Sequence, residues 1–169
     1  MAKPNLLVTY DPAHELSAKR EVELLLKNVK EKATFLKSHE GVFNLRTKDA
    51  RKVVVKLANL CDRYPQQFNN TFRYIPIDRW TKSNIKEMQR AVNGFAKGID
   101  EKESWMLSVN KRRHKSSERD LIIKLTGKVN KPKVDLLNPD WIIRVEMLGK
   151  EAGFSLLKSS ELLITNRYK

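Results

Sequence analysis

The sequence has few of the residues that build cofactor and metal sites. Only 6 of its 169 residues are glycine, and they form neither the Gly-rich loop of a dinucleotide site nor a Walker loop. The three histidines, His14, His39 and His114, have no cysteine or carboxylate companion at metal-ligand spacing. We therefore expect no cofactor and no metal, and the sequence does not favour nucleotide or metal catalysis.

A single cysteine and the lack of a long apolar run limit where the chain can work. Cys61 falls at an apolar position of an expected helix, so we expect a small buried residue in a reducing compartment rather than a nucleophile. No segment approaches about 18 consecutive apolar residues, and the first ten residues lack the apolar region of a signal peptide. The sequence therefore predicts a cytoplasmic protein with no membrane partner.

Positive charge, by contrast, is abundant. The chain has 34 Lys and Arg against 20 Asp and Glu, which gives a formal net charge of +14. The excess is present in both halves, whereas a basic tail would concentrate it. An anionic membrane surface would also suit this charge, but the apolar faces of the expected helices are needed to build cores. The composition therefore favours a polyanionic partner, such as a nucleic acid.

The first half of the chain alternates strand and helix patterns in the order βαββαβ, which is typical of a ferredoxin-like domain. Its strands are expected at residues 5–10, 34–37, 42–46 and 72–80, with Pro76 at an edge or a bulge. The first helix is expected between residues 18 and 29. The second helix begins after Thr47, which can cap it, and ends before Pro65.

The second half contains further helices and strands. Asn84 with Glu87 predicts a helix start, and Ser117 with Asp120 predicts another. Strands are expected at residues 105–110, 141–147 and 153–157, and residues 161–168 fit either a short strand or a tail. We therefore expect a mixed fold, α+β or α/β, with a ferredoxin-like domain over residues 1–80 packed on a second domain over residues 81–169.

The strongest candidate for a binding site is the end of the strand at residues 105–110. There the basic residues Lys111, Arg112, Arg113 and Lys115 come just before the helix start at Ser117. Cations and the free amides of a helix N-terminus can converge on one phosphate. The same run would also suit a solvated loop, and the motif alone does not decide between the two interpretations.

Two further groups of residues have both a functional and a structural interpretation. An unpaired nucleotide could stack on Trp80, Tyr74, His114 or the Arg112/Arg113 pair, with Arg79 and Lys82 adding charge beside Trp80. For Trp80, burial at the domain junction is the favoured interpretation. The segment that contains Asp135, Asn138, Pro139 and Asp140 could supply acid and base groups. For this segment the turn chemistry of Asp, Asn and Pro is the favoured interpretation.

Three segments together resemble a THUMP domain: the basic strand end from Ser108 to Lys115, the segment from Lys133 to Glu146, and Gly153-Phe154-Ser155. The chain most resembles the stand-alone THUMP adaptors of tRNA N4-acetylcytidine formation, in which a ferredoxin-like domain precedes the THUMP domain.

The resemblance implies a protein that binds tRNA through the acceptor stem and the 3′ end and presents it to a separate tRNA acetyltransferase, without being an enzyme itself. It places Lys111, Arg112 and Arg113 at the family's basic strand end. Asp135, Asn138, Pro139 and Asp140 correspond to the family's signature turn.

Many THUMP proteins carry a fused catalytic domain, for which 169 residues leave no room, so we expect the enzyme on another chain. Two alternatives remain. The chain could be a targeting subunit for a tRNA methyltransferase or thiolation enzyme, or a small RNA-modifying enzyme that acts alone.

Overall fold

The computed structural model describes residues 3–112 and 116–165 and shows two compact units. The first unit is formed by two segments, the chain up to Ile77 and the C-terminal segment from Ser160. The second unit is continuous and runs from Asp78 to Ser159. The expected division into residues 1–80 and 81–169 differs from this, because the last residues return to the first unit. The expected mixed α/β fold class is confirmed.

The first unit has the predicted βαββαβ order, with one more strand from the C-terminal segment. Its sheet has the strand order β2-β3-β1-β4-β9, and all neighbouring strands are antiparallel. Two short 3-10 turns flank the helices, at Pro12–His14 and Pro65–Gln67. The elements are β1 (Leu6–Tyr10), α1 (Glu15–Asn28), β2 (Ala33–Phe35), β3 (Val42–Thr47), α2 (Ala50–Arg63), β4 (Thr71–Pro76) and β9 (Leu163–Ile164).

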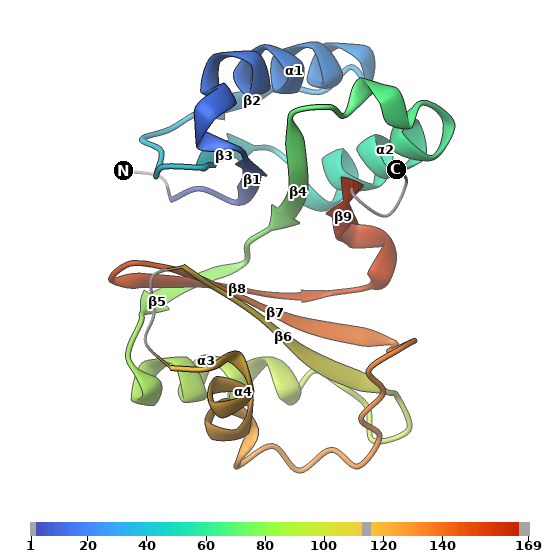
Figure 1. Cartoon of the computed structure of the whole chain (residues 1–169). Coiled ribbons are helices and arrows are strands. Elements are labelled where there is room, and N and C mark those ends of the chain that lie inside the picture. Colours follow the sequence, from blue (N-terminus) through green and yellow to red (C-terminus); the bar gives the residue numbers. More distant parts are fainter. Residues whose placement is uncertain (1–2, 113–115, 166–169) are drawn as a thin grey trace. The chain divides into compact units, whose positions relative to one another are not determined.

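Both helices of the first unit pack their apolar faces on the sheet (Figure 1). Cys61 of α2 is fully buried in this core, as predicted. The helix cap differs from the prediction, because Asp49 rather than Thr47 accepts a hydrogen bond at the start of α2, from the Lys52 amide at 3.1 Å. Thr47 instead donates its hydroxyl to the Lys32 carbonyl at 2.7 Å and so ties β3 to the segment before β2.

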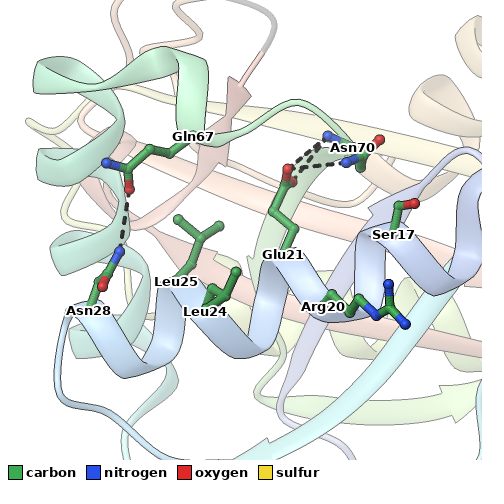
Figure 2. Close-up of a pocket in the computed structure, with 8 residues that line it drawn as sticks. All are labelled: Ser17, Arg20, Glu21, Leu24, Leu25, Asn28, Gln67 and Asn70. Carbon is green, nitrogen blue, oxygen red and sulfur yellow. Dashed lines mark hydrogen bonds between the residues drawn. The ribbon is translucent and has the colours of Figure 1, made fainter.

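A nearly buried carboxylate fixes the entry into β4. Glu21 of α1 accepts hydrogen bonds from the backbone amides of Asn69 and Asn70 at 2.8 and 3.0 Å and from the Thr71 hydroxyl at 2.7 Å. Figure 2 shows Glu21 reaching from α1 to Asn70 at the edge of a pocket of about 450 Å³. Because these amides precede the strand, no ladder partner is available to them, and the carboxylate supplies the acceptor.

Replacing Glu21 with Ala should lower the free energy of unfolding by about 3 kcal/mol, because it leaves several partly buried donors without an acceptor. Urea unfolding followed by circular dichroism measures this loss. Glu23→Ala, at an exposed position of the same helix, is the matched control and should stay within about 0.5 kcal/mol of the wild type. Equal stability of the two variants would show that the Glu21 hydrogen bonds do not stabilise the fold.

The second unit is a four-stranded sheet with two helices on one face (Figure 1). The strand order is β5-β8-β7-β6, in which β6 and β7 are parallel and the other neighbours are antiparallel. The elements are β5 (Arg79–Lys82), α3 (Ile85–Ala96), β6 (Trp105–Arg112), α4 (Glu118–Thr126), β7 (Trp141–Leu148) and β8 (Glu151–Leu157). A 3-10 turn at Ser159–Glu161 follows β8.

The single strand predicted at residues 72–80 is therefore wrong. It is two strands, β4 and β5, which belong to different sheets. The caps predicted at Asn84 and Ser117 are confirmed, since their side chains accept hydrogen bonds from the Glu87 and Asp120 amides.

Alternation along β6 sets which side chains face the helices. Trp105, Leu107 and Val109 are buried in the core with α3 and α4, as the period-two pattern predicts. The residues between them point to the opposite face of the sheet. Within the part of the chain that the structure describes, no helix is long and apolar enough to cross a membrane.

Candidate nucleic-acid interface

The basic end of β6 lies next to the start of α4. Lys111 donates its ammonium group to the Ser116 carbonyl at 2.6 Å, immediately before the capping residue Ser117. The juxtaposition of a cation and a helix N-terminus expected from the sequence is therefore present. Glu118 and Asp120 in the first turn of α4 already place negative charge at this N-terminus, which reduces its attraction for a phosphate.

Arg112 leaves the sheet on the opposite face from Lys111, because successive strand residues alternate. Its side chain is half-buried, and its Nε is buried without a hydrogen-bond partner among the described residues. The guanidinium charge also acts on Glu146, whose pKa it lowers as a minor contribution. The sequence predicts one cluster of basic residues, whereas these two cations point to opposite faces of the sheet. Arg113, His114 and Lys115 lie outside the described residues.

The candidates on β5 lie at the other edge of the sheet. Arg79, Trp80 and Lys82 are separated from β6 by β8 and β7, so three strand spacings of roughly 4.8 Å place the two groups about 14 Å apart. The Arg79 guanidinium packs over α3, where its Nη1 lies 3.7 Å from the position that a Cβ on Gly94 would occupy. The structure thus brings the predicted residues to two separate edges rather than to one pocket.

Trp80 lies opposite Gly153 in the antiparallel pair of β5 and β8. An aromatic side chain across from a glycine covers backbone that the missing side chain would leave open. Trp80 is half-buried. Tyr74, the other aromatic candidate, is wrong as a stacking residue. It is buried in the first unit, where its hydroxyl donates to Thr71 at 2.9 Å, and burial raises its pKa.

The predicted turn residues lie at the opposite end of β6 from Lys111 and Arg112. Asp140 accepts a hydrogen bond from the Ser104 amide, and the Asp140 amide donates to the Ser104 hydroxyl, both at 2.8 Å. Ser104 precedes Trp105, the first residue of β6. Since β6 has eight residues, about 23 Å separate the turn from the basic end.

Asp135 has a structural role in the same turn. Its carboxylate accepts from the amides of Asn138 and Leu137 at 3.0 and 2.9 Å, and these bonds lower the pKa of Asp135. Pro139 follows Asn138 and leads to Asp140. The arrangement agrees with the turn interpretation, in which these carboxylates bind backbone amides and hold the turn in place. No group of three or more His, Cys, Asp and Glu side chains within residues 3–112 and 116–165 could hold a metal ion.

A buried polar cluster that was not predicted from the sequence lies on the sheet face opposite α3 and α4. Arg144 donates to Glu146 at 3.1 Å and to the Ser108 hydroxyl at 2.7 Å. Burial raises the pKa of Glu146, and the Arg144 guanidinium opposes this shift. The available signal was the pair of charged residues two positions apart in the otherwise apolar strand Ile142–Leu148.

The family model described as THUMP domain matches residues 82–157. No curated protein matches the chain.

Among solved structures, the chain is similar to PH1313 from Pyrococcus horikoshii OT3, with a TM-score of 0.61 and 14% identity over 92% of this chain and 55% of that one. It is similar to TrmN from Thermus thermophilus, with a TM-score of 0.55 and 14% identity over 89% and 44% of the two chains. It is also similar to a 4-thiouridine synthetase in complex with RNA and ATP, with a TM-score of 0.53 and 14% identity over 96% and 42%.

The chain spans about half the length of these proteins, and likeness at this identity establishes a shared fold. The matched family segment begins in β5 and ends with the last residue of β8. It therefore coincides with the second unit almost completely, and that unit of the chain is a THUMP domain.

Proposed function

We propose that the protein is a tRNA-binding adaptor that presents the acceptor stem and 3′ end of tRNA to a separate acetyltransferase that forms N4-acetylcytidine. The observation that carries the proposal is a THUMP domain in a chain with a net charge of +14. A folded tRNA is recognised mainly by shape, phosphate and unpaired ends, for which basic surfaces are suited. We interpret the βαββαβ unit as the ferredoxin-like partner of this domain, and place the activity in the cytoplasm.

One of the similar structures supports RNA as the ligand class. A 4-thiouridine synthetase in complex with RNA shares the fold over 96% of this chain, and the matched region is 42% of that protein. In the proposal, the region shared with such proteins supplies RNA binding and a second chain supplies the chemistry. Holding the tRNA in the correct orientation raises the rate of the partner, because positioning removes part of the entropic barrier.

The test compares tRNA acetylation by an acetyltransferase from the same cell with and without the protein. Adding the protein should increase the rate of N4-acetylcytidine formation, most clearly at tRNA concentrations below saturation. The protein alone should modify no nucleotide, which mass spectrometry of the digested tRNA measures.

Two outcomes would replace the proposal. If acetylation is unchanged but a thiolated or methylated nucleotide disappears from tRNA when the gene is deleted, the protein is a targeting subunit for that other enzyme. The likeness to a 4-thiouridine synthetase favours this second candidate. If the pure protein modifies tRNA when common cofactors are added, it is an enzyme itself.

A further inference from the structure

A basic groove lies within the first unit, between the end of α1 and the edge of the sheet. Its volume is about 1140 Å³, and the segment that joins α1 to β2, the edge strand β2 and the end of β3 line it. Five exposed cations line this groove: Lys27, Lys30, Lys32, Arg46 and Lys48. Two acidic residues, Glu23 and Glu31, also line it. The cations are not contiguous in the sequence, and the fold brings them together.

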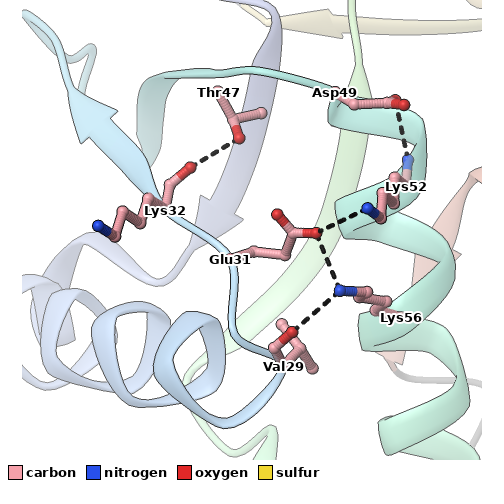
Figure 3. A network of polar contacts seen from close by, with 7 residues as sticks. All are labelled: Val29, Glu31, Lys32, Thr47, Asp49, Lys52 and Lys56. Atoms are coloured by element: carbon pink, nitrogen blue, oxygen red, sulfur yellow. Dashed lines mark hydrogen bonds and ion pairs between the residues drawn. The ribbon is translucent and has the colours of Figure 1, made fainter.

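One of the two acidic residues is already paired outside the groove. Glu31 accepts from the Lys56 ammonium at 3.0 Å and lies 3.9 Å from that of Lys52, and both lysines belong to α2. Figure 3 shows Glu31 pointing toward α2, while Lys32 extends away from it. In contrast, the ammonium groups of Lys27, Lys30, Lys32 and Lys48 form no hydrogen bond or ion pair with any described residue. The groove therefore keeps a strong positive potential.

Protection of a sheet edge does not account for these cations. Edge strands often carry lysine to prevent pairing with other chains. Here β2 itself consists of Ala33, Thr34 and Phe35 and has no charge. The cations come from α1, from the segment that joins α1 to β2, from β3 and from the residue that follows β3. They surround the groove instead of lying along the strand edge.

Lys30 provides an independent observation, because its backbone is unfavourable for a lysine. It has φ of 59°, and it is the only residue other than glycine with positive φ in the described segments. It follows the C-cap of α1, where the Lys30 amide donates to the Lys27 carbonyl and the Glu31 amide to the Leu26 carbonyl. Glycine is the usual residue in this helix-ending motif, since any other side chain adds strain. Backbone strain at a lysine that lines the basic groove supports a functional role for its side chain.

The groove offers charge without a free aromatic ring. Phe35 lines it, but the Lys19 ammonium lies 5.1 Å from the centre of its ring, and Phe43 packs against it edge-on with the ring centres 5.4 Å apart. Unpaired bases require an open aromatic face on which to stack. Backbone phosphates require only cations, and they fix position without reading sequence.

We propose that the basic groove binds phosphates of the double-helical part of tRNA. This site belongs to the first unit and is additional to the THUMP domain. The inference rests on the proposed tRNA binding and adds a second anchoring point for the same ligand.

The decisive variant is Lys30→Gly in the full-length protein. It removes a cation from the groove and relieves the backbone strain, so stability should increase while the affinity for tRNA decreases. The melting temperature should rise by about 2–4 °C, while the dissociation constant for tRNA should rise about tenfold. Lys30→Ala should lose the same affinity without the gain in melting temperature, because alanine keeps the strain.

A double variant and a control with equal charge complete the test. Lys27→Ala/Lys32→Ala should weaken tRNA binding and lower the slope of log K against log salt by about 2. Arg20→Ala/Arg63→Ala removes the same charge from exposed positions of α1 and α2 that do not line the groove. This control should bind tRNA almost as tightly as the wild type. Fluorescence anisotropy with labelled tRNA measures the dissociation constants of the wild type, the groove double variant and the control.

The possible results separate the inference from the proposed function. If the wild type does not bind tRNA, both fail. If the wild type binds and the groove variants bind equally well, or if the control pair loses as much affinity as the groove pair, the groove is not a tRNA site and the adaptor proposal stands. A third result is that the groove variants still bind tRNA but no longer bind a fluorescent poly-glutamate peptide that the wild type binds. In that case the ligand is an acidic protein segment and the inference is overturned.

Discussion

The affinity for tRNA should fall about a thousandfold when the salt concentration rises from roughly 50 to 200 mM, if the protein neutralises about six phosphates. The physical reason is that each bound phosphate releases condensed counterions, and added salt reduces the entropy gained by their release. The protein has enough cations for this number of contacts, with five in the basic groove and further ones at the edges of the THUMP domain. Titrations at four or more salt concentrations give the slope.

A competition experiment is the control for this prediction. Folded tRNA should displace labelled tRNA more effectively than a DNA duplex with the same number of phosphates, since shape and 2′-hydroxyl groups distinguish the two. Affinity that does not depend on salt would contradict phosphate binding. Equal displacement by DNA would leave only unspecific attraction to polyanions.

The second large effect concerns the buried pair of Arg144 and Glu146. Glu146→Leu should lower the free energy of unfolding by about 3–5 kcal/mol, because it leaves the Arg144 guanidinium buried without its counter-charge. The side chains of Arg144 and Glu146 are only 7% and 2% exposed, so water cannot replace the lost partner. Arg112 lies close enough to act on Glu146, and its charge would also lose compensation. Urea unfolding of the full-length protein measures the change.

The double variant Arg144→Met/Glu146→Leu is the control. Removing both charges together eliminates the desolvation cost of each, so most of the lost stability should return. If the double variant is as unstable as Glu146→Leu, shape rather than charge determines stability at this position. Arg112→Ala alone is a poor test of RNA binding for the same reason, since it disturbs a buried cluster as well as removing a cation.

Most of the helices and strands could be predicted from the sequence, because apolar periodicity and capping residues within each segment determine them. Alternation of apolar residues identified β6, and the side chains of Asn84 and Ser117 cap helices as expected. The pattern did not separate β4 from β5, because strand-forming residues lie on both sides of Pro76 and the proline was assigned to an edge or a bulge of one strand. Which sheet a strand joins depends on its pairing partners, which periodicity along the chain does not encode.

The candidate site was predicted less completely than the fold. A run of cations is visible in the sequence, so Lys111 and Arg112 were found, but their divergence to opposite faces follows from strand alternation at the very end of β6. The basic groove was missed because its cations come from separate elements, even though Lys27, Lys30 and Lys32 lie within six residues. Only the helix end at Lys30 and the β2–β3 pairing bring them to one place.

The return of the chain to the first sheet has a consequence for synthesis on the ribosome. β9 pairs with β4 through Arg73 and Tyr74, although the whole THUMP domain lies between these strands in sequence. The THUMP domain can therefore fold as a continuous segment as soon as it leaves the ribosome. The N-terminal sheet, in contrast, stays incomplete until its last strand, β9, has been synthesised. Until then the open edge of β4 is available for pairing with other nascent chains, and a ribosome that stalls before Leu163 releases a protein with that edge uncovered.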